Sequence, residues 1–153
     1  MTAKFLILSG DGINCERETL HAFEAVGLSG RIIHINELVQ NKSMLDDFQG
    51  LALPGGFSFG DELGSGQVLA LKIKKQLFQE FYRFVDDQKP IIGICNGFQV
   101  LTRLGLLPDH KTKRVLSLTH NSSGKFIDQW TDLVAPESTC LWTKGIDQLE
   151  LPV

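Results

Sequence analysis

Short apolar runs separated by helix-length segments constrain the fold of this sequence more than any other feature. Three such runs occupy residues 5–8, 50–53 and 91–94, each ended by Gly, Pro or a small polar residue, and a fourth occupies 31–35. Strands that alternate with helices indicate a parallel sheet, because a parallel pair needs a long crossover connection. We predict an α/β domain of three layers, with a mostly parallel central sheet and flanking helices.

The spacing of apolar residues predicts helices at residues 16–26, 66–85 and 96–104. We assign the long apolar stripe of the second helix to core packing. The inward positions of the other two are predicted to be Leu20, Phe23 and Val26 in the first and Phe98, Leu101 and Leu104 in the last. Gly105 is a predicted left-handed cap that ends the last helix.

The pattern changes after Pro108. Residues 114–119 and 125–127 have a strand-like composition, and residues 121–124 between them are turn formers. We therefore expect antiparallel additions to the sheet in this part of the chain. Because the sequence has no internal repeat and no linker-like stretch, residues 1–153 are predicted to form a single domain.

Charge and cysteine content argue against several classes of protein. The 15 Lys+Arg and 18 Asp+Glu residues are scattered and give a net charge of −3, which does not indicate nucleic-acid binding. No apolar run approaches the roughly 18 residues that span a bilayer, and none forms a signal peptide, so we expect a cytoplasmic protein without membrane contact. The three cysteines form no CxxC pair, so we expect free thiols and no metal.

The most informative motif is Gly-x-Cys-x-Gly at residues 93–97, between a predicted strand and a predicted helix. It is the cysteine counterpart of a nucleophile elbow, in which a sharp turn presents the nucleophile above the sheet. The helix N-terminus favours the thiolate form of Cys95, and the N–H of Asn96 is placed where an oxyanion would form. We predict that Cys95 is a nucleophile, whereas Cys15 and Cys140 lack such surroundings.

A second glycine-rich segment, residues 53–66, also follows a predicted strand and precedes a predicted helix. It does not match a Walker A loop, because Asp61 stands where that motif requires Lys, and acidic side chains would repel phosphate. Two interpretations remain open. The backbone of Gly55 and Gly56 supplies a second oxyanion donor opposite Cys95, or the segment is a plain connecting loop.

Residues 54–61, Pro-Gly-Gly-Phe-Ser-Phe-Gly-Asp, and residues 93–101, Gly-Ile-Cys-Asn-Gly-Phe-Gln-Val-Leu, closely resemble class I glutamine amidotransferases. Within that group the chain looks like the glutaminase subunits or domains of phosphoribosylformylglycinamidine synthase, which Leu-Leu-Pro at 106–108 and the early Asn14-Cys15 also resemble. The resemblance covers nearly the whole chain and implies a flavodoxin-like arrangement of the three layers.

The resemblance implies that the protein hydrolyses glutamine to supply ammonia for de novo purine biosynthesis. Cys95 would attack the side-chain amide of glutamine and form a glutamyl thioester that water then hydrolyses. The other implied site residues are the backbone amides of Gly56 and Asn96, as an oxyanion hole, and Gln99, Asn121 and Ser123, as substrate contacts. The resemblance implies no cofactor in this chain, and a synthetase partner subunit that uses ATP and magnesium.

One motif of the family does not occur in residues 1–153. Family members carry a His-x-Glu segment, whose histidine takes the thiol proton and whose carboxylate orients that histidine. None of His21, His34, His110 and His120 precedes a glutamate by two residues, and His120 is the nearest to the predicted pocket. We expect this chain to lack the C-terminal part of the domain and to be inactive alone. A non-catalytic interaction module and a different cysteine-elbow hydrolase are the alternative functions.

Overall fold

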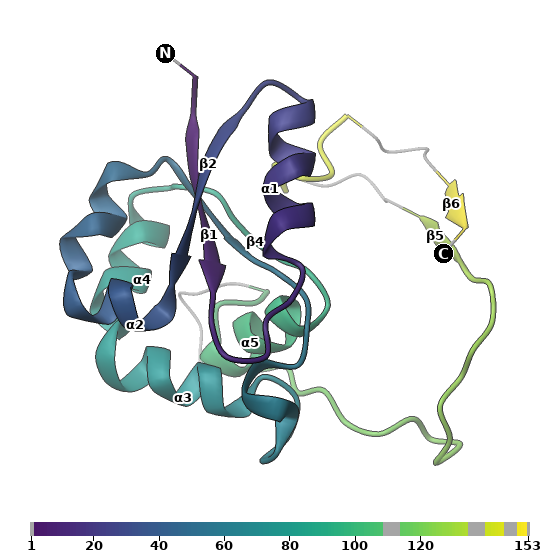
Figure 1. Ribbon diagram of the computed structural model, residues 1–153. Coiled ribbons are helices and arrows are strands. Elements are labelled where there is room, and N and C mark those ends of the chain that lie inside the picture. The colour runs from purple at the N-terminus through teal and green to yellow at the C-terminus, as the bar shows by residue number, and fades with distance from the viewer. Residues whose placement is uncertain (1, 109–113, 135–139, 146–149, 153) are drawn as a thin grey trace. The chain divides into compact units, whose positions relative to one another are not determined.

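The computed structural model describes residues 2–108, 114–134, 140–145 and 150–152. The chain divides into two compact units, Met1–Leu118 and Thr119–Val153. In the described residues of the first unit, four parallel strands form one sheet in the order β2-β1-β3-β4 (Figure 1). The predicted α/β fold with a mostly parallel sheet is confirmed.

The strands lie where the apolar runs predict them. Their bounds are β1 Lys4–Ser9, β2 Ser29–His34, β3 Gly50–Leu53 and β4 Ile91–Gly93. The first strand is central and pairs in parallel with both β2 and β3, and β3 pairs with β4. Every residue of β3 is buried, as expected for a strand covered on both faces.

Helices cover the two faces of this sheet. Figure 1 shows α1 on one side of the strands, and α2 and α4 on the other. The bounds are α1 Glu16–Ala25, α2 Ile35–Gln40, α3 Gln67–Gln76, α4 Phe78–Asp86 and α5 Asn96–Leu104, with short 3₁₀ segments η1 Lys42–Asp47 and η2 Ser58–Asp61. Within the described residues, no helix combines the length and the apolar character needed to cross a bilayer.

The helix predicted over residues 66–85 is two helices in the structure. The chain breaks at Leu77, whose φ of −132° is far from helical, and α4 begins at the next residue. Leu77 is fully buried at this break. Most of the apolar stripe still belongs to the core, because α3 buries Leu69 and Ile73 while α4 buries Phe81 and Phe84. Leu71, which is part of the same stripe, is 40% exposed. Periodicity found the buried face but could not reveal the change of direction.

Two of the predicted inward positions are wrong. Val26 is 73% exposed because α1 ends at Ala25, so the residue is no longer on a helical face. Phe98 is 41% exposed, while Val100, Leu101 and Leu104 carry the buried side of α5. Gly105 adopts φ +80° and ends α5 as a left-handed cap, as predicted.

The antiparallel additions predicted for the sheet are also wrong. Residues 114–119 and 125–127 form no strand, and all side chains of residues 114–134 are exposed. A strand-like composition yields a strand only where a partner supplies a hydrogen-bonded edge and a buried face. The turn at 121–124 is confirmed by the bond from Gly124 N to Asn121 O. The second unit has its own antiparallel pair, β5 Asp132–Val134 with β6 Glu150–Pro152.

The strand order places a topological switch point at the centre of the sheet. The chain leaves β1 toward β2 on one side and returns through β3 on the other side. In open α/β sheets, crevices at the carboxyl ends of strands beside such a switch point are the usual ligand sites. Both glycine-rich motifs follow strands directly at this edge, one after β3 and the other after β4.

Candidate active site

Cys95 occupies the sharp turn between β4 and α5. Its backbone angles, φ 51° and ψ −109°, lie in a region that non-glycine residues rarely adopt. The residue is exposed and stands at the N-terminus of α5. Such strain persists only where the surrounding structure enforces it, and it is the backbone geometry of a nucleophile elbow.

The flanking glycines are required by close packing. A Cβ built on Gly93 would lie 2.6 Å from the carbonyl oxygen of Gly97, and one built on Gly97 would lie 1.9 Å from that of Leu53. Both obstacles are backbone atoms that cannot swing away. Gly93 therefore packs against the first turn of α5, and Gly97 packs against the end of β3, with no room for a side chain at either position, as the motif predicts.

The loop after β3 lies directly against the cysteine. A Cβ on Gly55 would be 3.4 Å from the Cβ of Cys95. The next residue, Gly56, has φ +136° and forms an isolated bridge with Ile13, in the loop after β1. The structure therefore brings the Gly55-Gly56 backbone beside Cys95, which favours the oxyanion interpretation over a plain connecting loop.

The side chain of Asn96 ties the elbow to this loop. Its Oδ1 accepts hydrogen bonds from the backbone N–H and the hydroxyl of Ser58, at 3.2 and 2.6 Å. Its Nδ2 donates to Asp61 Oδ1 at 3.1 Å and to Gln99 Oε1 at 3.0 Å. Asn96 is 2% exposed and Ser58 1% exposed, so the bonds between these two residues are shielded from water, while those to Asp61 and Gln99 are partly buried. Sequence reasoning assigned no role to this side chain, nor to Ser58 and Asp61.

Asp61 joins the network to the start of α3. The same Oδ1 that accepts from Asn96 also accepts from the backbone N–H of Gly66, the residue before that helix. The aspartate has φ +52°, a left-handed conformation. The available signal was the motif Phe-Ser-Phe-Gly-Asp itself, in which the short polar residues proved to be internal hydrogen-bonding groups rather than solvent-facing ones.

The loop after β1 forms a third wall, which the sequence did not predict. Phe57 N donates to Gly12 O at 2.8 Å, and Phe59 N donates to Asp11 O at 2.7 Å. The Sγ of Cys15 lies 3.7 Å from the position of a Cβ on Gly55. Three loops that follow β1, β3 and β4 therefore meet around Cys95.

The remaining predicted site residues fall into two groups. Gln99 lies one turn beyond Cys95 on α5, and its backbone N–H donates to Cys95 O. Asn121 and Ser123 belong to the second unit, where both donate to Lys125 O within an exposed turn. Their assignment as substrate contacts stays a prediction.

The histidines considered as a base stand in different parts of the chain. His120 belongs to the second unit, and His110 lies outside the described residues. His34 caps α2 by accepting from the N–H of Asn36. Among the residues that the structure describes, no three His, Cys, Asp or Glu side chains are grouped so that they could hold a metal ion.

An exposed cysteine at a strained strand-to-helix turn, at the carboxyl edge of a parallel sheet, defines the cysteine-elbow class of α/β proteins. A family model described as the CobB/CobQ-like glutamine amidotransferase domain matches residues 2–153. The chain therefore belongs to the CobB/CobQ-like glutamine amidotransferase family.

Individual relatives agree with this assignment. The chain is 49% identical to phosphoribosylformylglycinamidine synthase subunit PurQ of Dehalococcoides mccartyi, over 98% of its length and 60% of the relative. It is 43% identical to the PurQ subunit of Methanococcus maripaludis, over 98% of its length and 56% of the relative. A chain in the structure of PurLQS from Thermotoga maritima matches with a TM-score of 0.79 and 32% identity, over 100% of this chain and 66% of that one. The chain thus spans somewhat more than half the length of these curated relatives.

Proposed function

We propose that the protein is the glutaminase component of a phosphoribosylformylglycinamidine synthase, which hydrolyses glutamine and passes ammonia to a synthetase partner. The observation that carries this proposal is the strained, exposed Cys95 with the Gly55-Gly56 backbone packed against it. The family description supplies the reaction class, glutamine amidotransfer, and the names of the PurQ relatives supply the synthase to which such a subunit belongs. The PurLQS structure, in which a similar chain occurs, supports a synthetase partner.

In this proposal the thiolate of Cys95 attacks the side-chain amide carbon of glutamine. The negative charge that develops on the amide oxygen is met by the backbone N–H groups of Gly56 and Asn96. Loss of one such donor typically slows a reaction by about 10² to 10³. The C–N bond then breaks, ammonia leaves with a proton, and water hydrolyses the glutamyl thioester to glutamate and the free thiol.

The full reaction also needs a general base and a synthetase partner. A base must take the thiol proton and return it to ammonia, and the His-x-Glu segment that does so in similar proteins does not occur in residues 1–153. We assign ATP and magnesium to the synthetase partner, with no cofactor in this chain. We place the activity in the cytoplasm, whose reducing conditions suit a reaction that depends on a free thiol.

Covalent labelling tests the part of the chemistry that Cys95 carries. In the complete protein, a diazoketone analogue of glutamine is expected to alkylate Cys95, glutamine is expected to compete, and Cys95→Ser is expected to abolish the label. Peptide mass spectrometry locates the modified residue. Labelling confined to Cys15 or Cys140, or labelling of Cys95 that glutamine does not slow, would contradict the proposal.

A further inference from the structure

The carboxamide of Asn96 has an orientation that its partners fix. A backbone N–H can only donate, so the atom that faces Ser58 N must be the oxygen of Asn96. The Ser58 hydroxyl donates to the same oxygen. The Nδ2 group is thereby directed to the opposite side, where a carboxylate oxygen of Asp61 accepts from it. Since Asn96 is buried, these partners rather than solvent set its orientation.

The fixed orientation of Asn96 in turn sets that of Gln99. The Nδ2 group carries two hydrogens, and the structure uses one for Asp61 and the other for Gln99 Oε1. The oxygen of the Gln99 carboxamide therefore faces Asn96, and its Nε2 lies on the opposite side of the carboxamide. The described residues give that Nε2 no hydrogen-bond partner, and Gln99 is only partly buried.

We infer that Asn96 is a positioning residue, which orients the Gln99 carboxamide so that it offers only N–H donors to a bound ligand. The inference deepens the proposed function and rests on it. A donor pair at this place, one helical turn after the nucleophile, selects a ligand that presents a carbonyl or carboxylate oxygen. The backbone N–H of Asn96 faces the oxyanion, whereas its side chain acts through Gln99.

Asn96→Asp reverses the polarity of this arrangement with almost no change of shape. An acceptor replaces the donor that faces Gln99, so the Gln99 carboxamide turns its Nε2 toward residue 96 and presents its oxygen to the ligand. We expect the rate of Cys95 alkylation by the diazoketone analogue to fall at least tenfold. Alkylation by iodoacetamide needs an exposed thiolate but no ligand pocket, so the ratio of the diazoketone rate to the iodoacetamide rate removes any direct effect of the added charge on the thiolate. We expect this ratio to fall at least tenfold.

A double-mutant cycle separates positioning from a structural role. If Asn96 acts through Gln99, the double variant N96D/Q99A has the same ratio of diazoketone rate to iodoacetamide rate as Gln99→Ala alone, within twofold. Should the added carboxylate beside Asp61 prevent folding, Asn96→Ala replaces Asn96→Asp in the same cycle. Asn41→Asp, at an exposed asparagine that also accepts from a serine hydroxyl, is the matched control and is expected to leave both rates unchanged.

The outcomes distinguish this inference from the proposed function. If Cys95 of the complete wild-type protein is not labelled in competition with glutamine, the proposed function fails and the inference fails with it. If the wild type is labelled but the Asn96 variants keep its diazoketone rate, the positioning role is overturned and the function stands. The positioning role is also overturned if the effects of Asn96→Asp and Gln99→Ala on the diazoketone rate simply add. It is likewise overturned if the iodoacetamide rate falls as much as the diazoketone rate.

Discussion

The hydroxyls of Ser58 and Ser43 each donate to the Oδ1 of an asparagine, and the two hydrogen bonds lie in contrasting surroundings. The Ser58 bond to Asn96 is 2.6 Å long and both residues are buried. The Ser43 bond to Asn41 is 2.8 Å long and both residues are exposed. The chemical groups and distances are nearly the same, so the difference between the two regions is the access of water.

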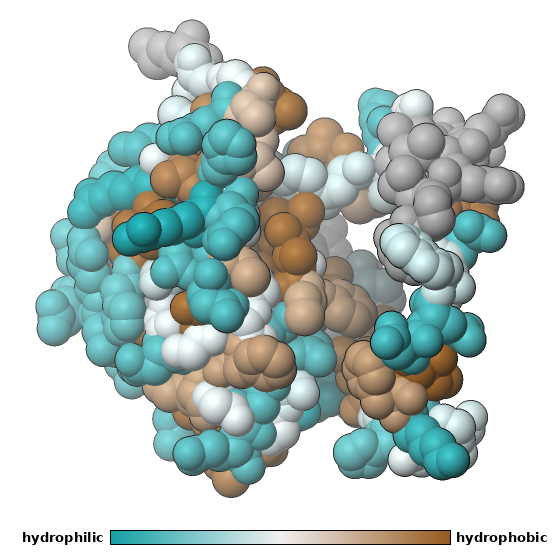
Figure 2. All heavy atoms as spheres, turned by 45° about the vertical axis from the view of Figure 1, so that its right-hand side comes forward, coloured by the Kyte–Doolittle hydropathy of each residue, from teal (hydrophilic) through white to brown (hydrophobic). Residues whose placement is uncertain are grey.

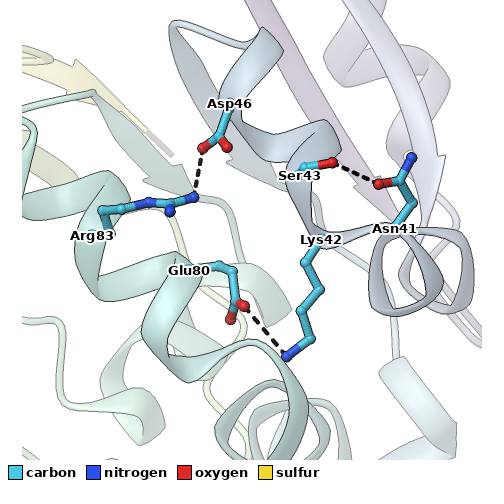
Figure 3. A network of polar contacts seen from close by, with 6 residues as sticks. All are labelled: Asn41, Lys42, Ser43, Asp46, Glu80 and Arg83. Atoms are coloured by element: carbon cyan, nitrogen blue, oxygen red, sulfur yellow. Dashed lines mark hydrogen bonds and ion pairs between the residues drawn. The ribbon is translucent and has the colours of Figure 1, made fainter.

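The surroundings of the exposed pair are equally open. Figure 3 shows Asn41 and Ser43 at the start of η1, beside two ion pairs that join this segment to α4. Arg83 lies 2.6 Å from Asp46, and Lys42 lies 3.3 Å from Glu80. Water competes for the exposed side chains of Arg83, Asp46 and Lys42, while that of Glu80 is 18% exposed, so short contacts here add little stability. In the active-site network an unmade hydrogen bond leaves a buried polar atom without any partner.

The two regions also differ in the apolar side chains that they expose. Polar side chains dominate much of the face drawn in Figure 2, with apolar patches among them. Around the elbow, however, Phe57 is 67% exposed and Ile94 is 44% exposed. Exposed apolar side chains therefore occur next to Cys95 and in the loop after β3, whereas the η1–α4 surface carries ion pairs.

Gly12→Ala is expected to give the largest loss of stability, and Gly27→Ala is its matched control. Both glycines have φ +81°, but a Cβ on Gly12 would lie 2.1 Å from Phe57 O, while one on Gly27 meets nothing within 4 Å. A left-handed alanine costs about 1 kcal/mol in open space, and overpacking adds about 2 kcal/mol. We expect losses of about 3 and about 1 kcal/mol.

Urea unfolding followed by far-ultraviolet circular dichroism measures these losses. This signal follows the helices and strands of the first unit, whereas Trp130 and Trp142 both belong to the second unit. Equal losses for the two alanine variants would mean that the loop after β1 yields to the added methyl group. The site would then be less rigidly packed than the crowding at Gly12 indicates.

The sequence predicted those features that depend on local pattern. Apolar runs located the four strands that the structure describes in the first unit. The glycines around Cys95 predicted the elbow, because a close approach of two backbone segments requires glycine at the point of contact. The break at Leu77 and the exposure of Phe98 were missed, since both depend on how a helix meets its neighbours. Periodicity records which residues are apolar but not where a tertiary contact begins or ends.

The polar network of the site was beyond sequence reasoning for a related reason. Asn96 and Ser58 are 38 positions apart and meet only because β3 and β4 are neighbours in the sheet. Short polar residues in glycine-rich loops are ordinarily interpreted as turn formers, and nothing local marks one of them as buried. Pairing of distant loops was needed to give Ser58 and Asp61 a role.

Ser58→Ala tests the contrast between the buried Ser58–Asn96 bond and the exposed Ser43–Asn41 bond, and it is expected to have an intermediate effect on stability. The substitution removes a buried donor to Asn96 but leaves the backbone N–H of residue 58 bonded to the same oxygen. We expect a loss of about 1 kcal/mol in the free energy of unfolding. Ser43→Ala, which removes the same bond at the surface, is expected to cost less than about 0.5 kcal/mol. Equal losses in the two variants would show that burial does not set the strength of these bonds.

Arg83→Ala is expected to have the smallest effect, even though its ion pair with Asp46 is among the shortest polar contacts in the molecule. The side chains of Arg83 and Asp46 are 54% and 56% exposed, so the attraction is screened by water and ions. We expect a loss of no more than about 0.5 kcal/mol, which shrinks further in 1 M salt. Comparison with Asp46→Ala and the double variant in urea isolates the pair. A coupling energy above about 1 kcal/mol that persists in high salt would show that this exposed ion pair stabilises the protein as much as a buried hydrogen bond does. Access of water would then not distinguish the two regions.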